Sequence, residues 1–386
     1  MPETRSRLAL YASVANELTH YDIGVADATL TRRESVSLPA NVQYVWPHAS
    51  QAFLYAATSD SASGMGAAGS NHHVSALKID RDSGALSLHG APIPLPTRPI
   101  HMATDIPSQH VLVAFNNPSA IHIYRINPDG TPGAEVAQPG PIDAGIFAHQ
   151  VRATPDSRHV ILVTRGHDPA GAKAEEPGAL MLWDFKDGML SNQQKVAPNG
   201  GYGFGPRHLD FHPSKPWVYV SLERENRLDM FTLANGRLSE RAVFRKNNLS
   251  QLGVPGARQA VGTVHVHPSG RFVYVANRAS TVVDGAFAGG ENTLAVYAID
   301  PATGEPSAIQ HIDTRGIHCR TFHIDPSGKL LVAAHIQGIK LRDGSEVPCC
   351  LSLFRIGDDG RLDYVRKYDV DVGGGRTQWW MGMVSF

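Results

Sequence analysis

Four polar residues occupy matching places in a repeated pattern of this sequence: His149, Arg207, Glu223 and Arg278. The two residues His149 and Arg207 each begin a strand-like segment, and Glu223 and Arg278 each end the segment that returns from the following turn. Arginine carries a permanent charge and a planar fork that fits a carboxylate or a phosphate. Histidine or glutamate can take a proton from water when its pKa lies near neutrality. These residue types predict acid–base chemistry on a small anionic substrate.

The pattern that places these residues is a strand, a turn that begins with proline, and a second strand. Its clearest copies are RHLDFHPSKPWVYVSLE (207–223), VHVHPSGRFVYVANR (264–278) and FHIDPSGKLLVAAHI (322–336). Weaker copies are VQYVWPHASQAFLYAAT (42–58), HMATDIPSQHVLVAFNN (101–117) and HQVRATPDSRHVILVTR (149–165). The marker prolines are separated by 60, 48, 58, 55 and 58 residues, at Pro47, Pro107, Pro155, Pro213, Pro268 and Pro326. This regular period indicates a repeat architecture.

Each copy is typical of a β-hairpin, and further strands follow it. Third strands are expected at residues 226–233, 292–299 and 350–356, and a turn rich in glycine and aspartate precedes a fourth. Four antiparallel strands in each repeat make one blade of a propeller. The period is too long for a β-helix, and no linker divides the chain into two β-sandwiches.

Six copies leave the two ends of the chain unassigned, and these ends complement each other. Residues 376–386 read as an inner strand without its marker turn, and residues 8–23 read as an outer pair of strands. Pairing the ends closes a ring of seven and leaves no exposed sheet edge. The sequence therefore predicts an all-β fold with a single domain over residues 1–386. That domain is a seven-bladed β-propeller of four-stranded antiparallel blades, closed by the N- and C-terminal strands.

A propeller brings equivalent positions of successive blades to one end of its central channel. In the fourth copy, Arg207 starts one strand, the chain turns at Pro213, and Glu223 ends the returning strand beside it. A structural ion pair is the alternative for any one such pair, but four polar groups at one rim favour a site. The longer segments 166–179, 281–291 and 337–348 are predicted to be loops that shape specificity.

The segment GPRHLDFHP at residues 205–213, with VYVSLE ending at Glu223, resembles the lactonase family of seven-bladed propellers. That family contains bacterial 6-phosphogluconolactonase and fungal 3-carboxy-cis,cis-muconate cyclase, and the similarity runs over nearly the whole chain. In the family, the matching residues form the proposed active site, which the resemblance carries over to His149, Arg207, Glu223 and Arg278. Here SLERE stands where relatives often have a shorter Asn-Glu-Leu pattern, so Glu225 competes with Glu223 for the role.

The resemblance implies a lactonase that opens a small carboxylated or phosphorylated lactone of the sugar-acid type. Opening the ring requires a deprotonated water near the carbonyl, and His149 or Glu223 is the candidate base. Arg207 and Arg278 would bind the substrate anion and stabilise the developing oxyanion. One alternative is a lactone-forming cycloisomerase of the 3-carboxy-cis,cis-muconate type. Another is a non-catalytic propeller that binds partners at its rim, which the four polar positions disfavour.

Other residues near the starts of inner strands are candidates for substrate binding: His101, His318, Gln150 and Tyr44. Trp379 and Trp380 are similarly placed, although packing at the ring closure explains them better.

No metal or cofactor is expected from the sequence. The alternating His265 and His267 could suggest a metal site, but packing between blades is the preferred interpretation of histidines beside the proline turns. The sequence contains no Walker loop, no dinucleotide glycine motif after a strand and no Gly-x-Ser-x-Gly motif, which disfavours a covalent serine intermediate.

Composition limits the partners that this chain can have. The 35 lysines and arginines nearly balance the 36 acidic residues, so no net field attracts nucleic acid or an anionic membrane. An odd count of three cysteines favours a reducing, cytoplasmic compartment. The start of the chain resembles a signal peptide, but its apolar run is short and alternates as a strand does. We expect a monomer whose partner is a small anionic lactone.

Overall fold

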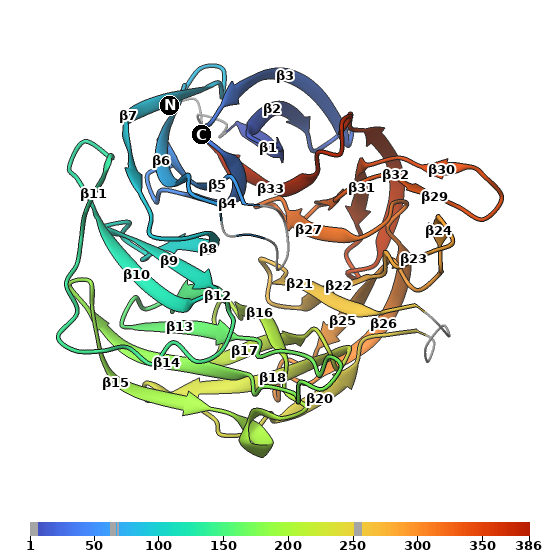
Figure 1. The fold of residues 1–386 in the computed structure, drawn as a ribbon. Coiled ribbons are helices and arrows are strands. Elements are labelled where there is room, and N and C mark those ends of the chain that lie inside the picture. Colours follow the sequence, from blue (N-terminus) through green and yellow to red (C-terminus); the bar gives the residue numbers. More distant parts are fainter. Residues whose placement is uncertain (1–6, 62–66, 68, 251–256) are drawn as a thin grey trace.

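The computed structural model describes residues 7–61, 67, 69–250 and 257–386, and these residues form seven blades around a central channel (Figure 1). The inner strands are β4 (Asn41–Pro47), β8 (Pro99–Thr104), β12 (Ala148–Ala153), β16 (Pro206–Phe211), β21 (Ala260–Val266), β27 (Cys319–Ile324) and β33 (Gln378–Ser385). The second strands are β5 (Phe53–Ser59), β9 (His110–Asn116), β13 (His159–Thr164), β17 (Trp217–Leu222), β22 (Phe272–Arg278), β28 (Leu330–His335) and β1 (Leu8–Val14).

Two further strands complete each blade. The third strands are β6 (His72–Ile79), β10 (Ser119–Ile126), β14 (Ala179–Lys186), β18 (Arg227–Ala234), β25 (Thr293–Ile299), β31 (Cys350–Ile356) and β2 (Glu17–Gly24). The outer strands are β7 (Leu86–Pro94), β11 (Pro132–Glu135), β15 (Met189–Val196), β20 (Phe244–Asn247), β26 (Pro306–Asp313), β32 (Leu362–Asp369) and β3 (Thr29–Ser37). A short strand β19 (Arg237–Leu238) also pairs with β18, and a 3-10 turn covers Pro198–Gly201. The predicted all-β propeller with antiparallel blades is confirmed.

Burial decreases from the second and third strands of each blade toward its outer strand. The second strands β9, β17 and β22 are buried along their whole length, and most of their residues are apolar. Outer strands such as β15 and β32 alternate mostly exposed residues with single buried ones. The hydrophobic clusters lie mainly between the faces of neighbouring blades, so each blade depends on the next for its core.

Histidines beside the hairpin turns link successive blades, as the sequence predicts. His212 contacts the carbonyl of Gly270 at 3.0 Å, and His267 contacts that of Gly328 at 2.8 Å. Both glycines have φ of +72°, and an added Cβ would lie 2.6 and 2.4 Å from the imidazole of the preceding blade. A side chain at either turn would therefore displace the neighbouring blade.

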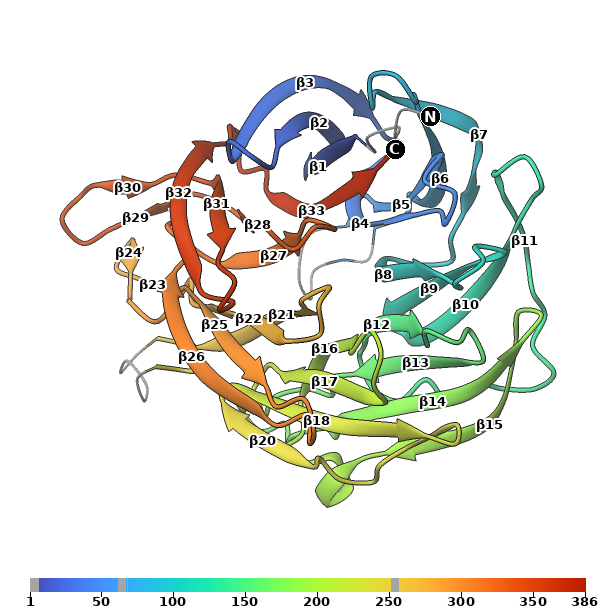
Figure 2. The same cartoon turned by 180° about the vertical axis from the view of Figure 1, so that it is seen from behind.

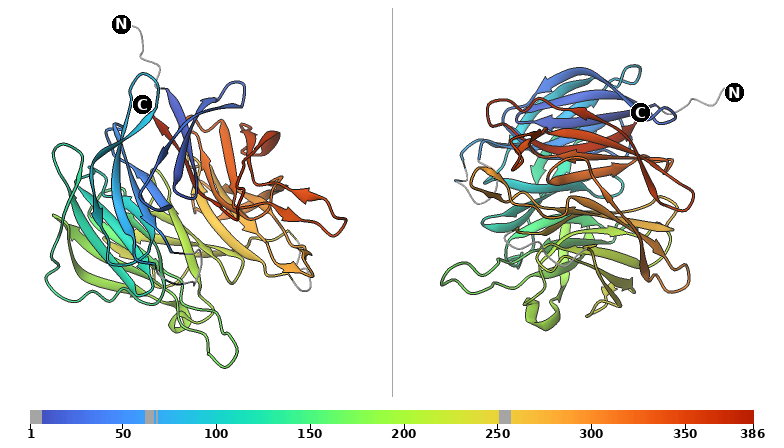
Figure 3. Two further views of the ribbon diagram at one scale, coloured as in Figure 1. Left: turned by 45° about the horizontal axis from the view of Figure 1, so that its top comes forward. Right: turned by 90° about the vertical axis from the view of Figure 1, so that its right-hand side faces the viewer.

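The two ends of the chain meet in one blade, with the order β3-β2-β1-β33. The C-terminal β33 is the inner strand and pairs antiparallel with β1. The red and blue strands accordingly lie side by side from behind (Figure 2) and in the tilted views (Figure 3). The predicted closure is confirmed, except that the N-terminal segment supplies three strands rather than two. Trp380 packs in the core of this closure with Ala9 and Tyr11.

The three segments predicted as loops all connect the second strand of a blade to the third. Two of them contain small hairpins, β23 (Val282–Val283) with β24 (Ala286–Phe287) and β29 (Ile339–Lys340) with β30 (Glu346–Val347). Because strands alternate in direction, these loops share one rim with the starts of the inner strands. Within the described residues, no helix has the length and apolar character needed to cross a membrane.

Candidate active site

Over the described residues, the inner strand of every blade carries a register shift near its start. In five inner strands the shift leaves one residue without a direct partner on the second strand: Gln43, Ile100, His149, Arg207 and Arg320. In the other two the shift falls across Gly262–Thr263 and across Trp379–Trp380. A bulge re-aims a side chain without ending the strand, so the repeated bulge gives a ring of residues at one end of the channel.

The ends of the second strands lie beside these bulges. The second strand runs antiparallel to the inner one, so the residue after the last pair reaches the same rim. In three consecutive blades this end of the second strand is charged: Arg165 and Glu223 each follow the last pair, and Arg278 is itself paired with Ala260. The site is therefore built from two rows, one from each strand of the innermost hairpins.

Glu223 is the centre of the resulting cluster. Arg278 Nη2 donates to Glu223 Oε1 at 2.5 Å, and Arg165 Nη1 donates to Glu223 Oε2 at 2.8 Å. Arg207 Nε lies 3.7 Å from the same Oε2. Each arginine comes from a different strand, and the carboxylate joins three blades at the rim.

The cluster holds more positive than negative charge. Three arginines contact the one carboxylate of Glu223, which leaves two positive charges in excess, and Arg320 of the sixth blade adds a third without pairing to it. Burial and the neighbouring Arg278 lower the pKa of Arg207 to about 9, so it remains a cation at neutral pH. Burial alone would raise the pKa of Glu223, but Arg278, Arg165 and Arg207 together hold it well below its usual range. The carboxylate is thus ionised and attracts protons weakly.

His149 lies beside this cluster in the uncharged form. Burial, and then the charge of Arg207, lower the pKa of His149 well below its usual range. Its ring lies 5.2 Å from that of His208, measured between centroids. Its buried Nδ1 has no hydrogen-bond partner among the described residues. A neutral imidazole without a fixed partner is able to accept a proton.

His318 contacts the cluster through Arg278. The Nη1 of Arg278 lies 3.1 Å from His318 Nε2, and the hydroxyl of Ser280 lies 2.9 Å from His318 Nδ1. Because the arginine must donate, Nε2 accepts and Nδ1 carries the proton toward Ser280. His318 has φ of +59°, and its backbone N–H donates to Asn292 at 2.8 Å. These contacts orient His318 toward Arg278.

Tyr44, His101 and Gln150 lie one position deeper than the bulges. The rings of Tyr44 and His101 are 3.9 Å apart between centroids, and both groups face the channel interior. The amide of Gln150 bonds to the backbone of Leu209 at both ends, with the Leu209 N–H donating at 2.7 Å and Gln150 Nε2 donating at 3.3 Å. Gln150 therefore joins two inner strands.

Glu225 lies outside the arginine cluster. Its Oε2 accepts the N–H of Gly205 at 3.0 Å, and its Oε1 lies 3.6 Å from Arg224. Strand β17 ends at Leu222, so the alternation that would place Glu223 and Glu225 on one face does not continue. The geometry associates Glu223, and not Glu225, with Arg165, Arg207 and Arg278.

Two arginines of the site, Arg165 and Arg320, were not singled out by the sequence reasoning. A signal for both exists in the repeat. Arg165 lies ten residues after Pro155, as Glu223 does after Pro213 and Arg278 after Pro268. Arg320 lies six residues before Pro326, as Arg207 does before Pro213 and His149 before Pro155. Aligning the copies on the prolines would have found both residues.

Ion pairs attach the loop at 166–179 to the rim. Arg224 Nη2 lies 3.0 Å from Glu175, and its Nε lies 3.5 Å from Asp168. Asp168 also pairs with Arg258, which precedes β21, at 2.5 Å. This loop is therefore bound to two blades next to Glu223.

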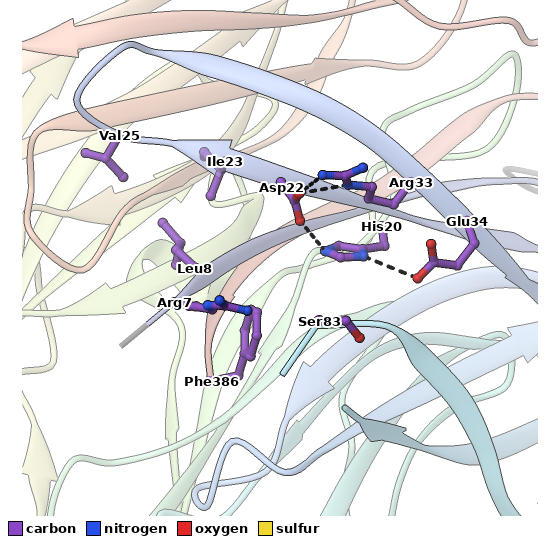
Figure 4. A pocket seen from close by; sticks show the side chains of 10 residues that line it. All are labelled: Arg7, Leu8, His20, Asp22, Ile23, Val25, Arg33, Glu34, Ser83 and Phe386. Carbon is purple, nitrogen blue, oxygen red and sulfur yellow. Dashed lines mark hydrogen bonds and ion pairs between the residues drawn. The ribbon is translucent and has the colours of Figure 1, made fainter. Parts of the chain in front are cut away.

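A cavity of about 920 Å³ lies away from the arginine cluster, at the ring closure (Figure 4). Its charged groups already neutralise one another. His20 lies 3.3 Å from Asp22 and 3.6 Å from Glu34, and Arg33 pairs with Asp22 at 2.5 Å. In the part of the chain that the structure describes, no group of three or more His, Cys, Asp or Glu side chains is arranged to hold a metal ion.

Comparisons with known proteins identify the family of this chain. The chain matches the family described as lactonase, 7-bladed beta-propeller, over residues 9–340. It is 27% identical over 323 residues to the 6-phosphogluconolactonase of Bacillus subtilis, and the aligned region covers 79% of this chain and 82% of the relative. A solved structure from Bacteroides fragilis has a TM-score of 0.73 at 19% identity, covering 100% and 99% of the two chains. The periplasmic gluconolactonase of Pseudomonas aeruginosa has a TM-score of 0.68 at 17% identity, covering 98% and 99%. The chain belongs to the lactonase family of seven-bladed β-propellers.

Proposed function

We propose that this protein hydrolyses a phosphorylated sugar-acid lactone, with 6-phosphogluconolactone as the first candidate. One observation carries the proposal: an ionised, buried Glu223 is shared by three arginines at the channel rim, next to the uncharged His149. Such an excess of fixed positive charge suits a substrate with a phosphate and a carbonyl that becomes an oxyanion. The named Bacillus subtilis relative supports the same substrate class.

His149 is the better of the two candidate bases. The pKa of each group is lowered, but His149 Nδ1 has no hydrogen-bond partner among the described residues, whereas both oxygens of Glu223 already accept from arginines. In the proposed step, His149 takes a proton from water as the oxygen attacks the ring carbonyl. The proton then passes to the ring oxygen as its bond to the carbonyl carbon breaks, which gives a hydroxy acid.

Glu223 organises the arginines that stabilise the reaction. Without its charge, Arg165, Arg207 and Arg278 would repel one another at close range. With it, their remaining donors can point toward the oxygen that develops negative charge. The protein thereby supplies preorganised donors rather than a covalent nucleophile.

The test is a panel of lactones with the wild-type protein and His149→Gln. Proton release is followed in a weakly buffered solution with 6-phosphoglucono-δ-lactone, glucono-δ-lactone and a muconolactone. We expect turnover of the phosphorylated lactone above its spontaneous rate, and a decrease in kcat of about a hundredfold or more in His149→Gln. Equal rates for the variant and the wild type would contradict the role of His149, and no turnover of any lactone would contradict the function.

The cycloisomerase and binding-module alternatives gain no support from the relatives, and the muconolactone arm of the panel tests the first. We further propose a cytoplasmic location, because Cys319, Cys349 and Cys350 are buried free thiols. The periplasmic relative from Pseudomonas aeruginosa shows that the fold also serves outside that compartment.

A further inference from the structure

Arg320 differs from the other arginines of the rim in its surroundings. It occupies the bulge of β27, the position that Arg207 holds in β16. Its guanidinium lies 3.5 Å from the centroid of the Trp379 ring, and its Nε donates to the carbonyl of Trp379 at 3.1 Å. Arg320 is therefore held against the inner strand of the next blade.

The charge of Arg320 has no direct counterion. No carboxylate lies within ion-pair distance of it among the described residues, and its two terminal nitrogens have no hydrogen-bond partner there. Burial, followed by Arg207 and Arg278, lowers the pKa of Arg320 well below its usual range. A cation that is packed among cations is stabilised when an anion binds beside it.

Trp379 presents a second unused donor at the same place. The residue is 9% exposed, and its indole Nε1 is buried without a hydrogen-bond partner among the described residues. Arg98 also lies over its ring, at 5.9 Å, and donates from Nε to Gln43 at 3.0 Å. A cavity of about 320 Å³, lined in part by Gln43, Ser61 and Trp379, opens beside this group.

We propose that Arg320 and Trp379 bind the phosphoryl group of the lactone, while the cluster around Glu223 acts on its ester. The terminal nitrogens of Arg320 and the Nε1–H of Trp379 would donate to phosphoryl oxygens. The substrate would then span the channel mouth, from the sixth and seventh blades to the third and fourth. This inference rests on the proposed function, because it assigns the two ends of the same substrate.

The first experiment measures selectivity in Arg320→Met, which keeps a long side chain but removes the charge. The quantity is the ratio of kcat/KM for 6-phosphoglucono-δ-lactone to kcat/KM for glucono-δ-lactone. We expect this ratio to fall about tenfold or more, mainly through a higher KM for the phosphorylated lactone. An unchanged ratio would overturn the proposal, including the case in which both substrates lose activity equally.

Two further variants separate binding from folding. Trp379→Phe keeps an aromatic platform and removes only the Nε1–H, so we expect a selective loss of about threefold on the phosphorylated lactone. Arg366→Met removes an exposed arginine of the outer strand β32 and should leave the ratio unchanged. If Arg320→Met does not fold, an unchanged ratio in Trp379→Phe is sufficient to overturn the proposed donor.

A binding experiment distinguishes failure of this inference from failure of the proposed function. Calorimetry compares the affinity of 6-phosphogluconate for the wild type and for Arg320→Met. If the wild type hydrolyses neither lactone but binds 6-phosphogluconate at least tenfold more tightly than the variant, the phosphoryl site stands and the lactonase proposal fails. If hydrolysis is observed and the two proteins bind 6-phosphogluconate equally, the phosphoryl site fails and the lactonase proposal stands.

Discussion

The arginines at the two depths of the central channel differ in how many carboxylates balance their charge. At the rim, three arginines share the single carboxylate of Glu223, and Arg320 adds a fourth positive charge without a paired carboxylate. Deeper in the channel, Arg152 faces Asp210 one to one, with Nη1 at 3.3 Å from Oδ1. Arg152 also lies over the rings of Trp46 and Phe211, at 5.0 and 5.6 Å.

The deeper pair is satisfied by the protein itself. Asp210 also accepts the N–H of Val266 at 2.9 Å and lies 3.5 Å from His265 Nδ1, so it joins three neighbouring blades. A cavity of about 240 Å³ is lined by this pair together with Tyr44 and other channel residues. Balanced charge at this depth is typical of a structural pair, whereas the excess at the rim suits the anionic substrate that we propose.

Replacing Glu223 by glutamine tests the role of the unbalanced charge at the rim and has the largest expected effect. The change keeps the shape of the side chain but leaves three arginines without their shared counterion. We expect kcat/KM for the phosphorylated lactone to fall by roughly a thousandfold, since the oxyanion donors lose their arrangement. The free energy of unfolding should also fall, by about 3 kcal/mol, as measured by urea denaturation. Activity within threefold of the wild type would refute the organising role of Glu223.

Replacing Asp210 by asparagine tests the role of the balanced pair deeper in the channel. Arg152 would lose its partner in a partly buried position, so we expect the free energy of unfolding to fall by about 2 kcal/mol. The activity per folded molecule should stay within about twofold, because Asp210 lies below the proposed site. Asp363→Asn on the exposed face of β32 is the matched control and should change neither quantity. A large loss of activity in folded Asp210→Asn would show that both depths serve catalysis.

The sequence predicts the ring and four of the six rim residues for one physical reason. The hairpin and its proline turn recur with a regular period, so spacing alone reveals the blades and the equivalence of His149 with Arg207. The sequence does not show the bulge that turns these side chains toward the channel, because a register shift depends on pairing with the second strand. Arg320 lies as far before Pro326 as Arg207 lies before Pro213, so the spacing locates it, but the spacing does not show that the bulge turns its side chain toward the channel.

Local alternation failed where the strand ended. The expected alignment of Glu223 with Glu225 assumes that β17 continues, but the strand ends at Leu222 and the two carboxylates diverge. Gln150 shows another limit, since a channel-facing amide can be used entirely by a neighbouring backbone. Neither the end of a strand, which separates Glu223 from Glu225, nor pairing across blades, which uses Gln150, is encoded in the spacing of one strand.

A buried histidine outside the arginine cluster allows a third test, on the pH dependence of the free energy of unfolding. Its expected effect is the smallest. His335 is fully buried, and burial lowers its pKa to about 4. In the unfolded chain a histidine has a pKa of about 6.5, so below that pH the unfolded state binds a proton that the folded state excludes. The stabilisation is complete above pH 6.5 and is lost as the pH falls toward 4, by at most about 1.4 kcal/mol per pH unit.

The variant His335→Gln isolates this contribution. Glutamine can still donate to the carbonyl of Cys350, which the imidazole Nδ1 contacts at 3.1 Å, but it does not titrate. We expect the free energy of unfolding, measured in urea at pH 7, 6 and 5, to decline less steeply in the variant than in the wild type. Parallel declines would show that His335 accepts its proton without unfolding. In that case the pKa of a buried histidine would not distinguish a structural histidine from His149. Only the neighbouring arginines would then distinguish His149.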